Sequence, residues 1–143
     1  MEKSKHAVVL FDNGFSCSQA VLGAFAKEFE LSHQTAMRLS SAFGGGMAGS
    51  GETCGAITGA LMVIGLKYGR VVPEDTVAKE KTYEIIKELF QSFECKYNSL
   101  ICRKLRLDDR STPTKERQAH EKCCGYVRDV VMIVEELFQE YPN

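Results

Sequence analysis

Apolar positions recur at spacings of three and four along almost the whole chain, and strictly alternating segments are scarce. This spacing is typical of helices with one buried face, whereas alternation is typical of half-buried strands. The pattern therefore predicts an all-α helical bundle of about six to seven helices. The expected helices cover residues 2–12, 16–30, 32–43, 54–68, 73 to a break within 94–98, a short helix that carries Cys102, and a long last helix from Pro113.

The segment from Cys54 to Tyr68 is apolar on all sides, so we expect it to form a central helix. A glycine-rich loop precedes it, Thr53 is its predicted N-cap, and Gly69 stands where a left-handed C-terminal cap would fall. Asn98 or Ser99 is the predicted cap of the short helix. Small residues at spacing four on the central helix form a face that another helix can approach closely: Gly55, Ala56, Gly59 and Ala60.

The last helix carries its own stripe of apolar residues in steps of three and four, from Ala119 to Tyr141. Cys123 falls on this stripe and is predicted to face the core. Its neighbour Cys124 lies about 100° around the helix axis, on the side that holds His120. The two adjacent cysteines are therefore expected to have different surroundings.

Length and charge narrow the class of protein. The chain has 143 residues, a size that predicts one domain over 1–143, and 44% hydrophobic residues exclude disorder as its main state. Its 18 basic and 19 acidic side chains interleave and leave a net charge of −1, so no basic face predicts a nucleic-acid partner.

The uncharged run 53–66 is shorter than the roughly 20 residues of a membrane span. With no signal-peptide pattern at the N-terminus, we expect a cytoplasmic protein.

Six cysteines are the unusual feature of the composition. In a reducing cytoplasm, thiols at this density favour redox or metal chemistry over structural disulfides. Cys17, Cys54 and Cys102 each follow a predicted capping position and fall in the first turn of a helix. The helix dipole and unpaired amides there lower a thiol pKa. A single such cysteine could equally be a small buried hydrophobe, but three placed alike favour one shared site with Cys54 as the leading thiolate.

Four segments also resemble a known protein family. They are Phe-Ser-Cys17-Ser-Gln-Ala-Val-Leu, Gly44-Gly45-Gly46-Met47 followed by Cys54-Gly-Ala-Ile-Thr-Gly-Ala, Ser-Leu-Ile-Cys102-Arg, and Cys123 four residues before Val127. These segments resemble the C_GCAxxG_C_C family of redox-active proteins, which has four invariant cysteines. The resemblance implies that Cys95 and Cys124 are extra to the family's core. Because genes of similar proteins often lie near transporter genes, it also implies a link to a transporter system.

Two chemical classes and one non-catalytic alternative remain open. In the first class, a thiolate such as Cys54 attacks a disulfide or oxidant from a partner protein or small molecule, and Cys17, Cys102 or Cys123 resolves the product. In the second, the four thiolates bind zinc or an iron–sulfur cluster. His120 and Cys124 are then candidate auxiliary metal ligands. In the third, the small-residue face forms a homodimer and the cysteines are incidental.

The glycine loop is a candidate binding element. Its sequence formally matches the dinucleotide pattern G-x-G-x-x-G, but the predicted helix before it excludes that fold, which needs a strand there. The amides of Gly44, Gly45 and Gly46, together with Gly55, could instead hold an anion, a sulfide or a thiolate beside Cys54. A flexible connection into a buried helix is the alternative.

Overall fold

The computed structural model describes residues 2–143, and within them it contains seven α-helices and no strand. The α-helices are α1 (Glu2–Asp12), α2 (Cys17–Phe25), α3 (His33–Ser40), α4 (Gly55–Tyr68), α5 (Thr76–Tyr97), α6 (Cys102–Leu105) and α7 (Pro113–Glu140), with 3₁₀ turns η1 (Ala26–Phe29) and η2 (Ser41–Phe43). The prediction of a single-domain all-α bundle is confirmed. So is the glycine-rich loop before an apolar helix.

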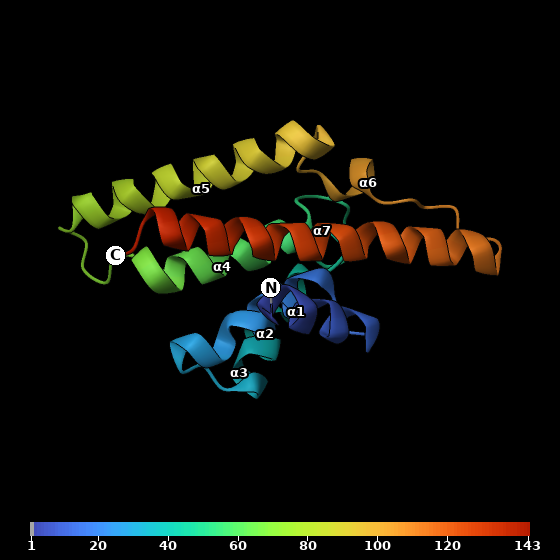
Figure 1. The fold of residues 1–143 in the computed structure, drawn as a ribbon, viewed down its shortest axis with the longest axis horizontal. Helices are drawn as coiled ribbons and strands as arrows, with labels where there is room; N and C mark the ends of the chain where they lie inside the picture. The colour runs from blue at the N-terminus through green and yellow to red at the C-terminus, as the bar shows by residue number, and fades with distance from the viewer. Residues whose placement is uncertain (1) are drawn as a thin grey trace.

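α7 runs along the length of the molecule and organises the other helices (Figure 1). α5 lies along one side of it, and α1 packs against α7 on the other side, where α2 and α3 follow. α4 contacts α2, α5 and α7, and therefore lies between the two groups. The core between them contains large, fully buried side chains from these helices, among them Phe25, Ile57, Leu89 and Val130.

The small-residue face of α4 is covered by α2. A Cβ atom added to Gly59 would lie 2.9 Å from the carbonyl oxygen of Ser18 and 2.9 Å from Cβ of Val21. Glycine at this position therefore lets the two helix backbones approach closely, which offsets its cost of about 0.5–1 kcal/mol in a helix. The face is therefore occupied within one chain, and the homodimer stays a prediction.

Several predicted caps are found where the sequence indicates them. Ser16 and Gln19 form a reciprocal capping box at the start of α2, and the Ser32 side chain accepts a hydrogen bond from the Thr35 amide in α3. α7 begins at Pro113 as predicted, and Thr112, which is not among the predicted caps, is its N-cap. The predicted helices 16–30 and 32–43 end earlier as α-helices and continue as the 3₁₀ turns η1 and η2.

The predicted ends of α4 are wrong in detail. Its N-cap is Cys54 and not Thr53, because Thr53 forms an isolated antiparallel bridge with Ile101. Cys54 therefore precedes the first turn and does not lie within it. Gly69 is not left-handed either: its φ is −62°, in extended backbone.

The predicted cap of the short helix is also wrong. The N-cap of α6 is Ile101, and neither Asn98 nor Ser99 fills that position. Asn98 instead ends α5 in the left-handed conformation, with φ of 68°. The break predicted within residues 94–98 is thus found at its last residue, and it keeps Cys95 on α5 apart from Cys102 on α6.

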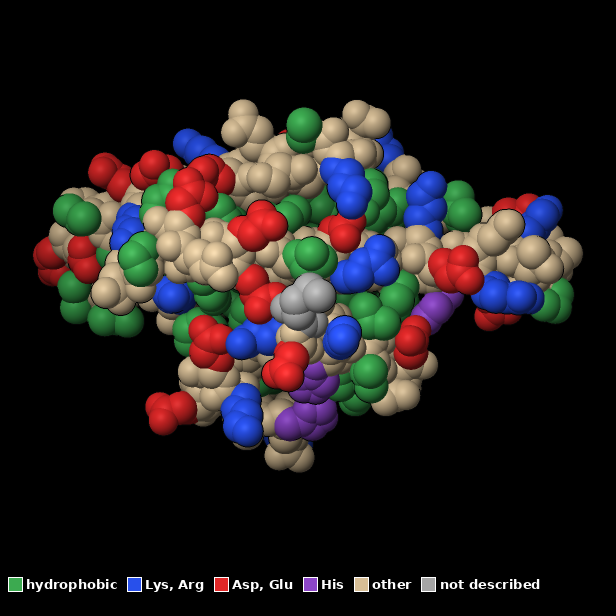
Figure 2. All heavy atoms as spheres, viewed as in Figure 1, with side chains coloured by type: hydrophobic (Ala, Val, Ile, Leu, Met, Phe, Trp, Pro, Cys, Tyr) green, Lys and Arg blue, Asp and Glu red, His purple; other side chains and the backbone are tan. Residues whose placement is uncertain are grey.

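The surface carries charges of both signs. Lys and Arg side chains are interspersed with Asp and Glu over the face shown in Figure 2, without a continuous basic patch. None of the helices in residues 2–143 combines the length and apolar character needed to span a bilayer.

Candidate functional site

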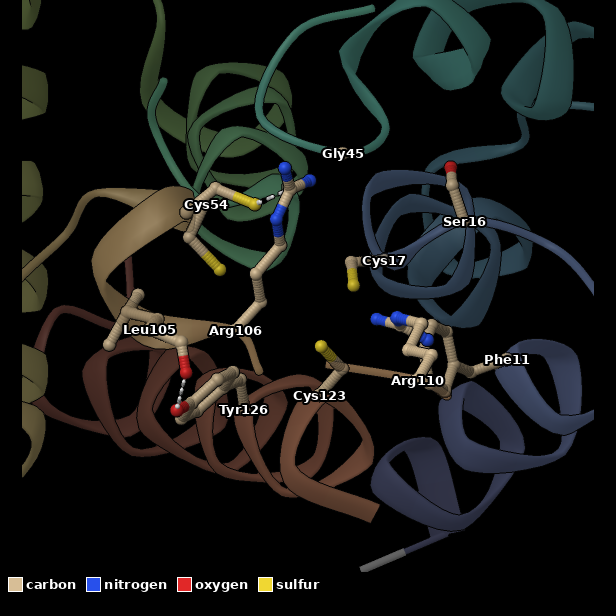
Figure 3. A pocket seen from close by; sticks show the side chains of 12 residues that line it. Phe11, Ser16, Cys17, Gly45, Cys54, Leu105, Arg106, Arg110, Cys123 and Tyr126 are labelled. Atoms are coloured by element: carbon tan, nitrogen blue, oxygen red, sulfur yellow. Dashed lines mark hydrogen bonds between the residues drawn. The ribbon is translucent and has the colours of Figure 1, made fainter. Parts of the chain in front are cut away.

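A cavity of about 180 Å³ lies where the ends of α2, α4 and α6 meet the side of α7 (Figure 3). Its lining includes four of the six cysteines: Cys17, Cys54, Cys102 and Cys123. Cys17 is the first residue of α2, Cys54 is the N-cap of α4, Cys102 begins α6 and Cys123 lies within α7. The fold therefore brings together the four thiols that the sequence singled out.

Two backbone hydrogen bonds hold Cys54 and Cys102 at this cavity. The Cys54 amide donates to the carbonyl of Leu100 at 2.8 Å, and the Cys102 amide donates to the carbonyl of Glu52 at 2.6 Å. These bonds flank the bridge between Thr53 and Ile101. In antiparallel pairing, positions on either side of a bridged pair place their side chains on the same face. The bridge thus directs both sulfur atoms to one side.

The glycine loop has an unusual backbone. Five consecutive residues, 45–49, have positive φ, including Met47 and Ala48 as well as three glycines. The amides of residues 47–52 donate to backbone carbonyls of the loop or of η2. These six amides are therefore already paired within the loop and the turn before it. The hypothesis that the amides of Gly44, Gly45, Gly46 and Gly55 hold an anion stays a prediction.

The predicted binding glycines divide into two groups. Gly45 and Gly55 line the cavity, whereas Gly44 and Gly46 do not. A Cβ on Gly46 would lie 2.7 Å from Cβ of Cys102, and a Cβ on Gly44 would lie 2.6 Å from Cβ of Ser16. A Cβ on Gly55 would lie 3.1 Å from Cβ of Cys17. The geometry gives these glycines a packing role, which is to let the loop and α4 approach the cysteine-bearing segments.

The thiols of Cys17 and Cys123 face each other in the cavity (Figure 3). Hydrogen bonding with Cys17 lowers the pKa of Cys123 from 9.0 to about 7, against the opposing effect of burial. Arg110, His120 and Arg106 lower it further through their positive electrostatic effect. The same hydrogen bonding, followed by burial, raises the pKa of Cys17 well above its ordinary value. Of the two thiols, Cys123 is therefore the one whose ionised form is favoured.

Cys54 and Cys102 are held in the protonated form. Burial raises the pKa of Cys54 to about 11, although the amides of Ala56 and Ile57 at the start of α4 act in the opposite direction. Burial also raises the pKa of Cys102, and Arg106, whose Nη1 lies 3.9 Å from Cys102 Sγ, opposes this effect. The expectation that helix starts lower these pKa values is thus wrong. Desolvation of the sulfur outweighs the helix amides.

Sequence reasoning missed the two arginines and the tyrosine of the lining. Arg106 and Arg110 lie in the segment between α6 and α7, and Tyr126 lies on α7. The Tyr126 hydroxyl donates to the Leu105 carbonyl at 2.7 Å and thereby ties α6 to α7. No motif marks these residues, because their positions depend on how the 106–112 segment turns back towards α7.

The auxiliary metal ligands predicted on α7 lie outside the cavity lining. His120 Nε2 is 2.7 Å from Asp12 Oδ1, and its ring stacks on Phe11 at 4.6 Å between centroids. Cys124 is half-buried, and burial raises its pKa. Within residues 2–143, no group of three or more His, Cys, Asp or Glu side chains is arranged to hold a metal ion. The four thiols thus share one cavity without the arrangement of a formed metal site.

Comparisons with known proteins agree with the importance of these cysteines. No curated protein and no solved structure matches the chain. A family model described as "Putative redox-active protein (C_GCAxxG_C_C)" matches residues 15–137, a span that contains all four cavity cysteines. Since the match covers most of the sequence, the chain belongs to the C_GCAxxG_C_C family.

Proposed function

We propose that this protein carries out thiol–disulfide exchange, with Cys17 and Cys123 as the working pair. The observation that carries the proposal is that the sulfur atoms of Cys17 and Cys123 face each other in the cavity (Figure 3). Facing thiols on two packed helices are the pair best placed to form a disulfide. The attacking species in such chemistry is a thiolate, and a pKa near the ambient pH gives the best balance of ionisation and nucleophilicity.

The proposed reaction has two steps. Cys123 as thiolate attacks one sulfur of a substrate disulfide, so that a mixed disulfide forms on Cys123 and the other substrate sulfur leaves as a thiolate. Cys17 then loses its proton and attacks Sγ of Cys123. This step forms the Cys17–Cys123 disulfide and releases the second substrate thiolate. The pair gives up two electrons and two protons, and the substrate disulfide becomes two thiols.

This assignment moves the attacking role from Cys54 to Cys123. Burial raises the pKa of Cys54 to about 11 and keeps it protonated at neutral pH, whereas the pKa of Cys123 is lowered, which favours its thiolate. Cys54 and Cys102 would then remain reduced during the first exchange. They line the same cavity as the reacting pair, and the charge of each raises the pKa of Cys17.

Trapping the mixed disulfide tests the proposal. Reduced native protein, Cys17→Ser, Cys123→Ser and the exposed-site control Cys95→Ser would each be mixed with a small disulfide, quenched with acid and mapped by mass spectrometry. We expect native protein and Cys95→Ser to form the Cys17–Cys123 bond. Cys17→Ser should stop at a mixed disulfide on Cys123, and Cys123→Ser should react slowly. A native rate in Cys123→Ser, or a different internal bond in native protein, would overturn the assignment.

A metal site remains the competing use of the same four thiols, and their shared cavity is the observation in its favour. Four sulfur ligands suit zinc or an iron–sulfur cluster. Elemental analysis of anaerobically purified native protein and Cys54→Ser separates the two functions. Stoichiometric zinc or iron that is lost in the variant would support the metal site and count against thiol exchange as the main function.

A further inference from the structure

The cavity that holds the four thiols has a positively charged rim. Arg106 and Arg110 both line it, and its described lining includes no Asp or Glu. Nε of Arg106 pairs with Asp108 at 2.7 Å. Arg110 is exposed and has no carboxylate within ion-pairing distance among residues 2–143. Its guanidinium is therefore free to bind an anion at the mouth.

Arg110 is close to the sulfur pair proposed to react. In Figure 3 the Arg110 guanidinium is drawn beside the facing sulfur atoms of Cys17 and Cys123. Arg110 also stabilises the thiolate of Cys123 electrostatically, which agrees with this proximity. A guanidinium presents a planar fork of N–H donors that fits a carboxylate or a phosphate. A substrate anion on Arg110 would lie next to the attacking sulfur.

The remaining lining suits a small molecule with an apolar middle. Phe11, Leu105 and Tyr126 contribute apolar surface, and the cavity of about 180 Å³ admits a short chain rather than a folded protein surface. Alkyl carbons and sulfur atoms pack favourably against such side chains. The site therefore combines an apolar pocket, a reactive sulfur and the unpaired guanidinium of Arg110.

From this combination we infer that the substrate is a small anionic disulfide, bound with its negative group on Arg110 and its S–S bond at Cys123. The inference rests on the proposed thiol–disulfide exchange and specifies its substrate class. In the complete reaction, the S–S bond of the substrate breaks and the Cys17–Cys123 bond forms. The substrate leaves as two thiols, which take up the two protons of the pair, and no further oxidant is needed.

Three small symmetric disulfides of different charge test the inference: dianionic 3,3′-dithiodipropionate, neutral bis(2-hydroxyethyl) disulfide and dicationic cystamine. The rate of oxidation of the reduced full-length protein would be measured for each in single-turnover experiments. Dividing each rate by that of 2-mercaptoethanol with the same disulfide removes intrinsic reactivity. We expect the normalised rates to fall in the order anionic, neutral, cationic. Because salt screens exposed charges, we expect the anionic preference to shrink at high ionic strength.

Arg110→Gln supplies the residue-level test, with Arg117→Gln as a control of equal charge change. Arg117 is exposed on α7 and does not line the cavity. We expect Arg110→Gln to lower the ratio of the anionic to the neutral rate by about fivefold, and Arg117→Gln to leave it near the native value. The ratio is the readout because loss of Arg110 also weakens ionisation of Cys123, which slows all three disulfides alike.

The outcomes separate the two proposals. Equal normalised rates for the three disulfides, with a Cys17–Cys123 bond formed in each case, would overturn the anionic substrate and leave the exchange reaction intact. A ratio that falls equally in both arginine variants would overturn the role of Arg110. Failure of all three disulfides to form the Cys17–Cys123 bond would overturn the exchange reaction and the inference that rests on it.

Discussion

The side chains of Cys17, at the first position of α2, and of Cys123, within α7, point toward each other in the cavity (Figure 3). The two residues come from opposite ends of the chain, and the packing of α2 against α7 brings them together. A shared proton between two thiols makes the ionisation of each depend on the other. This contact therefore lets two residues that are far apart in the sequence affect each other's ionisation.

Replacing Cys17 should raise the pKa of Cys123. The hydrogen bond from Cys17 is the largest cause of the lowered value of about 7, so Cys17→Ala removes the donor and shifts the ionisation of Cys123 to higher pH. Cys17→Ser keeps an O–H donor and should shift it less. The pH dependence of Cys123 alkylation by iodoacetamide, mapped by mass spectrometry, measures both. A midpoint in Cys17→Ala equal to the native one would contradict the proposed donor.

Stability should fall at high pH through Cys54. Its folded-state pKa of about 11 lies above the ordinary 9.0, so its contribution is complete below pH 9 and is lost as pH rises through 11. The loss amounts to about 3 kcal/mol in the free energy of unfolding. Urea unfolding under reducing conditions from pH 7 to 11 measures it. Cys54→Ala should show a shallower decline than the exposed-site control Cys95→Ala, and identical slopes would refute the assignment.

Two glycines of α4 should respond oppositely to alanine. In Gly59→Ala the new Cβ would lie 2.9 Å from the Ser18 carbonyl oxygen, and we expect a destabilisation of about 1–3 kcal/mol. A Cβ on Gly65 meets no atom within 4 Å. Gly65→Ala should therefore stabilise the protein by about 0.5–1 kcal/mol through helix propensity. Urea unfolding of the two variants checks this, and a destabilised Gly65→Ala would mean that α4 is packed differently.

Tyr126→Phe should loosen α6 without removing bulk from the core. The variant loses the hydrogen bond to the Leu105 carbonyl, at a cost of about 1 kcal/mol. Hydrogen exchange should become faster at the Arg106 amide, which bonds to the Cys102 carbonyl at 2.9 Å. Tyr83→Phe, at a ring position that is 55% exposed, is the control and should change neither quantity. Unchanged exchange in α6 would show that another contact holds it.

Local features of the sequence were predictable because they depend on neighbours along the chain. The capping box of Ser16 and Gln19 and the start of α7 at Pro113 are both found. The predicted caps at Thr53 and Ser99 are wrong because a long-range backbone pairing takes this part of the chain into a bridge between Thr53 and Ile101. No pattern within either segment reveals the other.

The sequence by itself determined the all-α class and most helix bounds, and it indicated four cysteines as candidate site residues. These follow from hydrophobic spacing, capping residues and the family pattern, all of which are properties of short stretches of chain. Only the tertiary structure decided which thiol ionises. Burial of Cys54 outweighs the amides of its helix, and Cys17 lowers the pKa of Cys123 from across the fold. Desolvation and hydrogen bonding act through space, so the order of residues alone does not fix their balance.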